Sequence, residues 1–533
     1  MRLALIFPPS MPPSSPPCGI AYLKAFLGEG DLFDLNLLYH TTVLTMLKNG
    51  VLPVEADISG YVLEPEHLEE AVAFLKGKKF YDADEYNTKV SIFLNYMKKV
   101  DSYLVEQLMR YVFTDSMEDH AHQLFDDLLS PVKKDHPDAA GFSQLFIQQR
   151  DFILGLAKLL KEEDIPIIVG GASLWYNPGA YLSEIGVKKI DLSRIFDIVF
   201  YGEGEHSLQS FVQGEPLEKI PNVVYKKDTI IKNEETGIKD LDLLPPPDFD
   251  DFPLKEYYSP DIILPLLTSR GCYWMRCTFC IHHKSYYKYR VRSSEKVVED
   301  LRILQKRYNA SYFNFVDEMI HPQQFRELCD NIVKEGLNIR VYADCKPTND
   351  FTEKVLQSMY TAGVRCILWG VESGTQRILD VIDKGTTVQD IEQVLRTSHN
   401  VGIWNMIFFI VGYVTQTEDE LLNDIEFLTR NEPYISTFSK SLFQLEVGSR
   451  LYENPEKYHI SKIEKNPDPF SAVCHYEVLQ GLSNREAERM YISYADTLNR
   501  LSKVSPHFGR LRDHMLLFAD HLSLNPLKGN LEE

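Results

Sequence analysis

Short apolar runs alternate with amphipathic stretches along most of the chain, a pattern typical of parallel strands joined by helices. In the first part, apolar runs lie at residues 3–9, 139–146 and 165–173, the first ending in proline and the last in a small residue, and residues 150–164 have helical spacing. We therefore predict an α/β fold in which residues 1–240 form a Rossmann-like domain around a parallel sheet.

Two segments interrupt this pattern. Residues 41–135 are polar, have apolar stripes at helical spacing and lack strand-like runs, so we predict a helical insertion in the first domain. Residues 241–258 contain three consecutive prolines and five acidic residues. That composition is typical of a linker between domains.

Beyond the linker, strand-like and helix-like segments alternate again. Six such repeats lie within residues 259–450, and they predict a (β/α)6 partial TIM barrel. The chemistry of such a barrel is found at the carboxyl-terminal ends of its strands. We expect residues 451–533 to form a helical C-terminal region.

Composition narrows the classes of protein and partner. The 533 residues are 44% hydrophobic, which excludes a disordered chain, and their net charge is −21. This charge repels phosphate backbones and anionic membranes, so we expect neither nucleic acid nor membrane as a partner. Residues 406–414, the longest apolar run, are too few to span a bilayer, and the N-terminal run is too short for a secretory signal. We therefore expect a cytoplasmic protein.

Three of the eight cysteines, Cys272, Cys277 and Cys280, lie within nine residues after the first barrel strand. Thiolates so spaced in a loop can bind one soft metal centre. A zinc site normally uses four ligands, and a fourth ligand from His282 or His283 would strain the cage. A redox pair of Cys277 and Cys280 leaves Cys272 without a role. Three thiolates on a four-iron cluster leave one iron open to another ligand.

The cysteine segment "RGCYWMRCTFC" resembles the CxxxCxxC motif of the radical S-adenosylmethionine superfamily, with one extra residue between the first two cysteines. Three later segments also resemble the superfamily. They are "FNFVDE", "WGVESGTQRILDVIDKG" and "FFIVGYVTQTEDEL", the last with Tyr413 in place of the usual proline. The resemblance implies a [4Fe-4S] cluster, S-adenosylmethionine as cofactor, and a 5′-deoxyadenosyl radical that takes hydrogen from carbon.

The same resemblance implies roles for individual residues. The three cysteines would bind the cluster, and Asp317 and Glu318 would receive the amino group of S-adenosylmethionine. Glu372 and Ser373 would bind the ribose, and Lys384 would neutralise the carboxylate. The other residues expected to contact this cofactor are Phe279 and Gly412.

Residues 1–214, without the insertion, resemble the cobalamin-binding domain that precedes the barrel in cobalamin-dependent members of the superfamily. The resemblance places a set of residues from strand ends and turns beside the cofactor: Pro8, Pro9, Ser143, Gly170, Gly171, Gly202, Glu203, Gly204 and Glu205. The DxHxxG signature, which supplies a cobalt-binding histidine in other cobalamin proteins, is absent.

These resemblances imply a cobalamin-dependent radical methyltransferase that acts on an unactivated carbon of a peptide or natural-product substrate. Its electrons would come from a donor such as flavodoxin or ferredoxin. Three alternatives stay open. The same scaffold could catalyse a rearrangement or cyclisation, the N-terminal domain could be structural only, or the protein could be a zinc-stabilised binding module.

Overall fold

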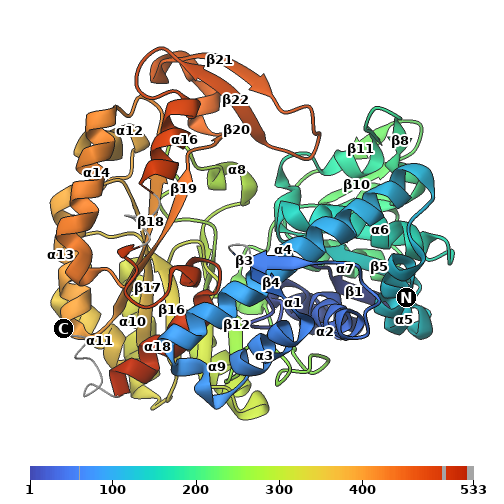
Figure 1. The fold of residues 1–533 in the computed structure, drawn as a ribbon, viewed down its shortest axis with the longest axis horizontal. Helices are drawn as coiled ribbons and strands as arrows, with labels where there is room; N and C mark the ends of the chain where they lie inside the picture. The colour runs from blue at the N-terminus through green and yellow to red at the C-terminus, as the bar shows by residue number, and fades with distance from the viewer. Residues whose placement is uncertain (59–60, 495–499, 525–533) are drawn as a thin grey trace. The chain divides into compact units, whose positions relative to one another are not determined.

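A computed structural model describes residues 1–58, 61–494 and 500–524. The chain forms two compact units, each with its own sheet (Figure 1). The N-terminal unit comprises Met1–Lys239 and Leu243–Ile262, and the barrel unit comprises Asp240–Asp242 and the described residues from Ile263 onward. Within the described residues, no helix is both long enough and apolar enough to cross a membrane.

The N-terminal unit is built on a seven-stranded sheet. In sheet order its strands are β11 (Ile230–Lys232), β10 (Val223–Lys226), β9 (Ile198–Phe200), β6 (Ile167–Gly170), β5 (Ala139–Ser143), β1 (Leu3–Phe7) and β2 (Asp31–Asp34). Strands β9, β6, β5, β1 and β2 are parallel, whereas β10 and β11 are antiparallel. The chain proceeds from β1 to one side and from β5 to the other, so the strand order reverses between β1 and β5. Open sheets of this kind bind ligands at that point.

Helices cover this sheet, and most of them match the helical spacing seen in the sequence. They are α1 (Cys18–Leu27), α2 (Leu35–Lys48), α3 (Pro65–Leu75), α4 (Ala83–Thr114), α5 (Asp119–Asp135), α6 (Arg150–Lys161) and α7 (Glu205–Val212). Residues 41–135 also contain a short antiparallel hairpin of β3 (Ala56–Ile58) and β4 (Tyr61–Leu63). Strands of three residues are too short to show the alternation by which a strand is predicted.

The segment that we predicted to be a linker packs on the N-terminal unit. Phe249 and Phe252 are buried. The Asp251 carboxylate accepts hydrogen bonds from Lys24 Nζ at 2.5 Å and from the Leu32 amide at 3.0 Å. Asp251 therefore acts as an acceptor within this unit, whereas composition alone suggested that the acidic residues of the segment were solvated.

The barrel unit has a six-stranded sheet in which every neighbouring pair is parallel. Its strands are β12 (Ile263–Leu266), β15 (Tyr312–Phe315), β16 (Arg340–Cys345), β17 (Val364–Glu372), β18 (Trp404–Val411) and β19 (Thr437–Leu442). The helices between and after them are α9 (Ser294–Tyr308), α10 (Pro322–Lys334), α11 (Glu353–Thr361), α12 (Gln376–Ile382), α13 (Val388–Val401) and α14 (Glu418–Asn431). This arrangement confirms the predicted partial barrel.

Local signals set the boundaries of these elements. All nine residues of β17 are buried, as expected for a central strand of a parallel sheet. Gly363 precedes it with φ at +106°, where a Cβ would lie 2.0 Å from the Ile339 carbonyl oxygen. Only glycine fits this turn. Helix α14 begins with a capping box formed by Thr417 and Glu420.

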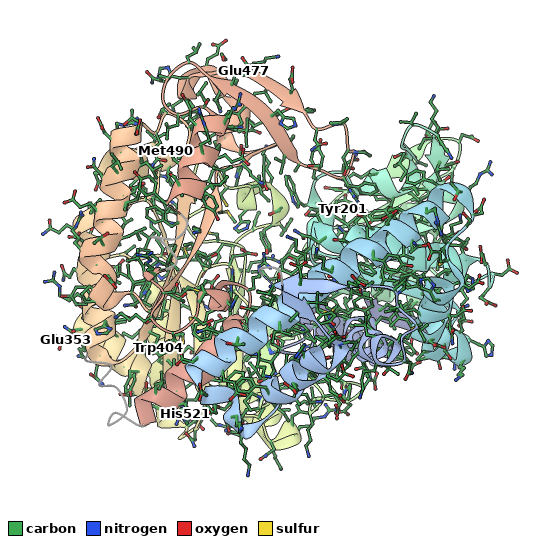
Figure 2. All side chains as sticks on the ribbon, in the orientation of Figure 1. Tyr201, Glu353, Trp404, Glu477, Met490 and His521 are labelled. Carbon is green, nitrogen blue, oxygen red and sulfur yellow. The ribbon has the colours of Figure 1, made fainter. Side chains whose placement is uncertain are left out.

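Helix α18 (Arg512–Leu524) packs on β15, β16 and β17. Tyr342 of β16 donates a hydrogen bond to Asp513 of this helix at 2.8 Å, and Trp404 of β18 lies against Phe508 just before it. Asn405, next to Trp404, points to the opposite face and donates to Leu395 of α13. Successive residues of a strand face opposite sides, so α18 lies on the face that α13 does not cover. Figure 2 marks Trp404 and, in α18, His521.

We had predicted a helical C-terminal region, but the structure shows that this region also contains strands. It contains α15 (Arg450–Glu453) and α16 (Asn484–Ser493), but also β21 (Ile460–Lys465) and β22 (Val473–Val478). These two strands pair with β20 (Leu445–Glu446) in an antiparallel sheet, visible at the top of Figure 1. Lys462, Glu464 and Lys465 of β21 are charged and exposed, which hides the strand from an apolar-run criterion.

Asp520 anchors α18 to the sheet. Its carboxylate accepts hydrogen bonds from Arg340 Nε at 2.5 Å, Arg365 Nε at 3.1 Å and Tyr312 Oη at 3.1 Å. We expect Asp520→Ala to destabilise the protein by roughly 3 kcal/mol, because it removes the carboxylate that pairs with two largely buried arginines. Chemical denaturation monitored by circular dichroism measures this. Asp330→Ala removes an exposed carboxylate from α10 and should change stability by less than about 0.5 kcal/mol. Equal midpoints for the two variants would contradict the assignment.

Candidate active site

The cysteine loop follows β12, at the end of the sheet where barrel enzymes place their chemistry. Hydrogen bonds fix it to the segment that contains α12. The Thr278 amide donates to the Ile382 carbonyl at 2.8 Å and its hydroxyl to the Val381 carbonyl at 2.9 Å. Trp274 Nε1 donates to the Asp383 carbonyl at 2.7 Å. The loop is therefore attached to the connection that follows β17, the longest strand of the sheet.

A second set of contacts holds the loop from α15. The Leu451 amide donates to the Thr278 carbonyl at 3.1 Å, and Arg450 Nη2 donates to the Met275 carbonyl at 3.2 Å. The backbone between the first and last cysteine is thus held on two sides. Such a loop can keep its thiols in place before a metal centre binds.

The three thiols lie close enough for their charges to interact, and Cys272 is buried. Among the described residues, no three His, Cys, Asp or Glu side chains converge as ligands of one metal ion. A four-iron cluster does not require such convergence, because each cysteine binds a different iron. Burial raises the pKa of Cys277 and raises that of Cys280 to about 12. A metal centre would replace these protons, since the thiolate is the ligand form.

Asp317 and Glu318, which follow β15, both contact the region of the cysteine loop. Asp317 is buried and accepts hydrogen bonds from the Thr268 amide at 3.2 Å, the Thr268 hydroxyl at 3.0 Å and the Ser269 hydroxyl at 2.6 Å. Glu318 accepts from Tyr286 and lies 3.2 Å from His282 Nε2. Both carboxylates therefore tie β15 to the residues that flank the cysteines.

Glu372 and Lys384 form a buried ion pair, with 2.9 Å between Lys384 Nζ and Glu372 Oε1. Burial opposes the charge of Lys384, but Glu372 and Cys277 raise its pKa above the ordinary value. A Cβ on Gly370 would lie 2.7 Å from Lys384 Nζ, so this glycine leaves room for the pair.

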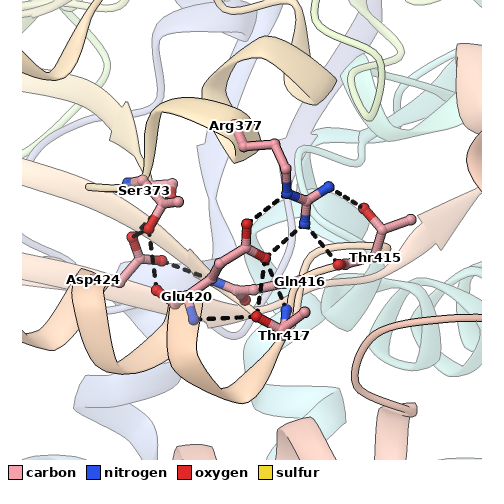
Figure 3. A network of polar contacts seen from close by, with 8 residues as sticks. Ser373, Arg377, Thr415, Gln416, Thr417, Glu420 and Asp424 are labelled. Carbon is pink, nitrogen blue, oxygen red and sulfur yellow. Dashed lines mark hydrogen bonds and ion pairs between the residues drawn. The ribbon is translucent and has the colours of Figure 1, made fainter.

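Ser373 belongs to a polar network between the end of β17 and α14 (Figure 3). Its hydroxyl donates to Asp424 at 2.8 Å, and the same carboxylate accepts from the Gly374 amide at 2.7 Å and from Gln416 Nε2 at 2.7 Å. Arg377 bonds Glu420 at 2.5 and 2.6 Å beside it. This network fixes the backbone after β17, and only Ser373 of its members was predicted.

Tyr413, which stands in place of the usual proline, is fully buried, and its hydroxyl lies 2.5 Å from the Thr278 hydroxyl. Its ring packs on Phe443 and Phe279. The adjacent Gly412 has φ at +72°, and its amide donates to Gln416 Oε1 at 2.8 Å. Tyr413 therefore links β18 to the cysteine loop through a hydrogen bond that proline could not make.

The N-terminal sheet brings its predicted residues to one edge. Pro8 and Pro9 follow β1, Ser143 ends β5 and pairs with Gly170 at the end of β6. Gly171 follows β6, and the remaining predicted residues follow β9: Gly202, Glu203, Gly204 and Glu205. Because these strands are parallel, all of these positions lie at their carboxyl-terminal ends.

Two glutamines, which we did not predict, organise this edge. Gln149 Nε2 donates to the Pro8 carbonyl at 2.8 Å, while its Oε1 accepts from the Leu145 and Phe146 amides. A Cβ on Gly171 would lie 2.3 Å from the Gln144 carbonyl oxygen, so the turn after β6 requires glycine for close packing on the turn after β5.

The turn after β5 also exposes apolar side chains. Leu145, Phe146 and Ile147 are 46%, 43% and 40% exposed. Glu203, in contrast, has a partner within its own unit, because its carboxylate accepts a hydrogen bond from the Ile238 amide at 2.8 Å. Glu205 is buried at the start of α7. The edge therefore offers glycines and apolar side chains, which suit a large flat ligand.

Two residues at the end of β16 were also missed. Asp344 lies 3.7 Å from Arg512 Nη1 of α18, and the Lys346 ammonium lies 3.2 Å from the centre of the Trp274 ring. Burial and the charge of Lys384 lower the pKa of Lys346 to about 8. The sequence signal was a polar residue at each of these strand-end positions in "ADCKP", but no family motif singled them out.

Comparison with known proteins shows which family the barrel resembles. Residues 266–428 match the family model of the Radical SAM superfamily. An uncharacterized methyltransferase of Pyrococcus horikoshii is 28% identical over 341 residues, which are 62% of this chain and 72% of that protein. The match confirms the predicted resemblance of the cysteine barrel.

Two solved structures share the fold. The cobalamin-dependent S-adenosylmethionine radical enzyme OxsB, with aqua-cobalamin and S-adenosylmethionine bound, has a TM-score of 0.57 and 16% identity, covering 80% of this chain and 73% of its own. The radical S-adenosylmethionine methyltransferase TsrM of Kitasatospora setae, with cobalamin and a [4Fe-4S] cluster bound, has a TM-score of 0.56 and 16% identity. It covers 92% of this chain and 85% of its own. These likenesses confirm the predicted fold class.

Asp344 should make stability depend on pH. Burial raises its pKa from 3.8 to about 7, Arg512 opposes the rise, and Glu318 and Asp317 add to it. The folded protein therefore keeps a proton that the unfolded chain releases, so the stability contributed by protonated Asp344 is full below pH 3.8 and is lost as the pH rises to about 7. Asp344→Asn does not titrate. We expect its melting temperature to rise relative to wild type between pH 5 and pH 8.

Thermal melts of both proteins at several pH values measure the difference. Asp330→Asn serves as the control for an exposed carboxylate. A melting-temperature difference between Asp344→Asn and wild type that stays constant from pH 5 to pH 8 would refute the buried position of this group.

Proposed function

Because residues 266–428 form a radical S-adenosylmethionine domain, we propose that the protein is a cobalamin-dependent radical methyltransferase that acts on carbon. The observation that carries this proposal is the three-cysteine loop, held on two sides at the carboxyl-terminal end of β12. It supplies three soft ligands for a cluster, and no fourth.

The residues of the loop fit a [4Fe-4S] cluster. Cys272, Cys277 and Cys280 supply the thiolates, and Lys384 and Lys346 lower the pKa of Cys277 against the effect of burial. When bound, the cluster would supply the electron that cleaves a carbon–sulfur bond of S-adenosylmethionine, with a flavodoxin or ferredoxin as electron donor.

Residues after β17 are suited to the ribose of S-adenosylmethionine. The Ser373 hydroxyl donates to Asp424 and accepts from the Thr375 amide at 3.1 Å, which leaves one lone pair of its oxygen to accept a hydrogen bond from a ribose hydroxyl. The Lys384 ion pair fixes one oxygen of Glu372, and the second oxygen can accept another ribose hydroxyl. Because Ser373 and Glu372 are held by buried partners, they need not reorganise when the cofactor binds.

Aromatic side chains protect the same site. Tyr413, Phe279 and Phe443 pack together beside Cys277. A radical able to take hydrogen from carbon would also take it from thiols and other hydrogen donors dissolved in water. An apolar wall therefore favours hydrogen transfer from the substrate to the radical. Asp317 and Glu318 support the other side of the cysteine loop. We propose that they position the loop and add negative charge near the amino group of S-adenosylmethionine.

We propose that the edge of the N-terminal sheet binds cobalamin. It lies at the reversal of strand order, has glycine turns after β6 and β9, and exposes three apolar side chains after β5. These features suit the face of a corrin ring. Both solved structures with this fold hold cobalamin. When bound, cobalamin would carry the methyl group.

A small molecule or peptide fits the proposed substrate class, and the acidic charge of the chain disfavours nucleic acid. Methylation consumes two molecules of S-adenosylmethionine, one leaving as S-adenosylhomocysteine and one as 5′-deoxyadenosine. Rearrangement or cyclisation on the same scaffold would form product without an equivalent amount of S-adenosylhomocysteine.

The first test uses anaerobically reconstituted protein, S-adenosylmethionine and a chemical reductant. We expect wild type to hold about four irons, as one [4Fe-4S] cluster requires, and to release 5′-deoxyadenosine. Cys277→Ala should lose both properties, because a cluster with two thiolates is not retained. Iron analysis and chromatography of the nucleosides measure the two outcomes.

Cys366→Ala is the matched control, since Cys366 is a buried cysteine of β17 that contacts Met515 instead of the cysteine loop. It should keep its iron. Wild-type protein that holds zinc without iron would overturn the proposal in favour of a zinc-stabilised module.

The second test concerns cobalamin. Phe146→Asp places a charge on the exposed turn after β5 without removing a buried side chain, and should weaken cobalamin binding about tenfold or more through lost apolar contact. Spectrophotometric titration with hydroxocobalamin measures the affinity. Ile230→Asp changes a side chain of β11 that is 42% exposed and should bind like wild type. Unchanged affinity in Phe146→Asp would place the corrin elsewhere.

A further inference from the structure

Lys346 is a buried cation that the proposed roles do not yet use. It directly follows β16 at the active end of the barrel, and only 1% of it is exposed. Among the described residues, no carboxylate lies within ion-pair distance of Lys346, and no acceptor receives a hydrogen bond from it. Its ammonium makes a cation–π contact with the Trp274 ring, whose centre lies 3.2 Å from Nζ. An ammonium buried in this way is unfavourable unless an anion completes its surroundings.

Trp274 holds this ammonium beside the cysteines. The residue lies between Cys272 and Cys277, and its Nε1 donates to the Asp383 carbonyl at 2.7 Å. Its ring packs so closely on Gly385 that a Cβ there would lie 2.2 Å from it. The ring is therefore fixed on two sides. A cation–π contact to a fixed ring positions a lysine but leaves its N–H donors available.

The two lysines of the site differ in their partners. Lys384, to which the sequence assigned the carboxylate of S-adenosylmethionine, already has Glu372 as a counter-ion at 2.9 Å. Lys346 has no counter-ion in the described part of the chain, and it lies close enough to Lys384, Cys277 and Cys272 for their charges to interact. The cation that lacks an anion is thus the one at the end of β16.

We propose that Lys346 binds the carboxylate of the methionine part of S-adenosylmethionine, and that Trp274 sets its position. This inference rests on the proposed function of the cysteine loop. The carboxylate is the only anion on that cofactor, whose sulfonium and ammonium groups a lysine would repel. A charge-assisted hydrogen bond in a buried site gives this contact both strength and direction. Lys384 then serves to fix Glu372 for the ribose.

The test compares S-adenosylmethionine with decarboxylated S-adenosylmethionine, which keeps the sulfonium, the ribose and the adenine. Equilibrium dialysis against reconstituted protein, without reductant, measures both dissociation constants. In wild type we expect S-adenosylmethionine to bind more tightly than the decarboxylated ligand. Lys346→Gln should weaken binding of S-adenosylmethionine about tenfold or more and change the affinity for the decarboxylated ligand much less. Lys346→Arg should restore part of the preference.

Lys503→Gln is the matched control, because Lys503 also has no ion pair with any residue that the structure describes and donates to the Pro433 carbonyl. It should bind both ligands as wild type does. If Lys346→Gln weakens both ligands equally, or neither, the proposal is wrong. Loss of iron with an unchanged preference would also overturn it, because Lys346 would then balance the charge of the cysteines. Failure of the proposed function looks different, since wild type itself would hold no iron and bind neither ligand.

Discussion

The attachment of the cysteine loop to the connection after β17 is the constraint on which the site depends. Residues 271–281, which carry the three cysteines, have no helix or strand of their own. Here, Thr278 and Trp274 bond carbonyl groups at the end of α12, while Tyr413 reaches the same threonine from β18. The geometry of the thiols is thus set by the central strands of the barrel. The residues proposed to bind the ribose belong to the same connection, so the two parts of the site share one support.

Among the described residues of the barrel site, most of the buried charged groups have an opposite charge or several hydrogen-bond donors beside them. Glu372 neutralises Lys384, and Arg512 lies near Asp344. Asp424 and Asp317 are buried but accept several hydrogen bonds each, which offsets part of the cost of burial. Compensation of this kind makes side chains rigid. Lys346 has an aromatic ring as its partner and, among the described residues, no anion. A bound ligand with a negative charge would compensate this lysine.

Much of this architecture could be predicted from sequence, because alternating strands and helices and a three-cysteine loop are local patterns. The parallel strands of the N-terminal sheet, the six barrel strands and the gathering of Pro8, Ser143 and Gly170 at one edge followed from them, whereas the antiparallel β10 and β11 did not. Contacts between distant segments could not be predicted. The composition of the segment around Asp251 predicts a linker, and only the structure reveals its contacts with Lys24 and Leu32. Likewise, nothing local reveals that Lys346 lies on Trp274, or that Asp424 organises Ser373. The strands of the C-terminal region were missed because β21 is largely charged.

The central claim is that three cysteines hold a four-iron cluster with one iron open to S-adenosylmethionine. Mössbauer spectroscopy of protein reconstituted with iron-57, before and after addition of S-adenosylmethionine, tests it most directly. The account predicts the spectrum of a [4Fe-4S] cluster in which one iron of four changes its parameters when the cofactor is added. A spectrum that S-adenosylmethionine leaves unchanged, or the absence of bound iron, would contradict it.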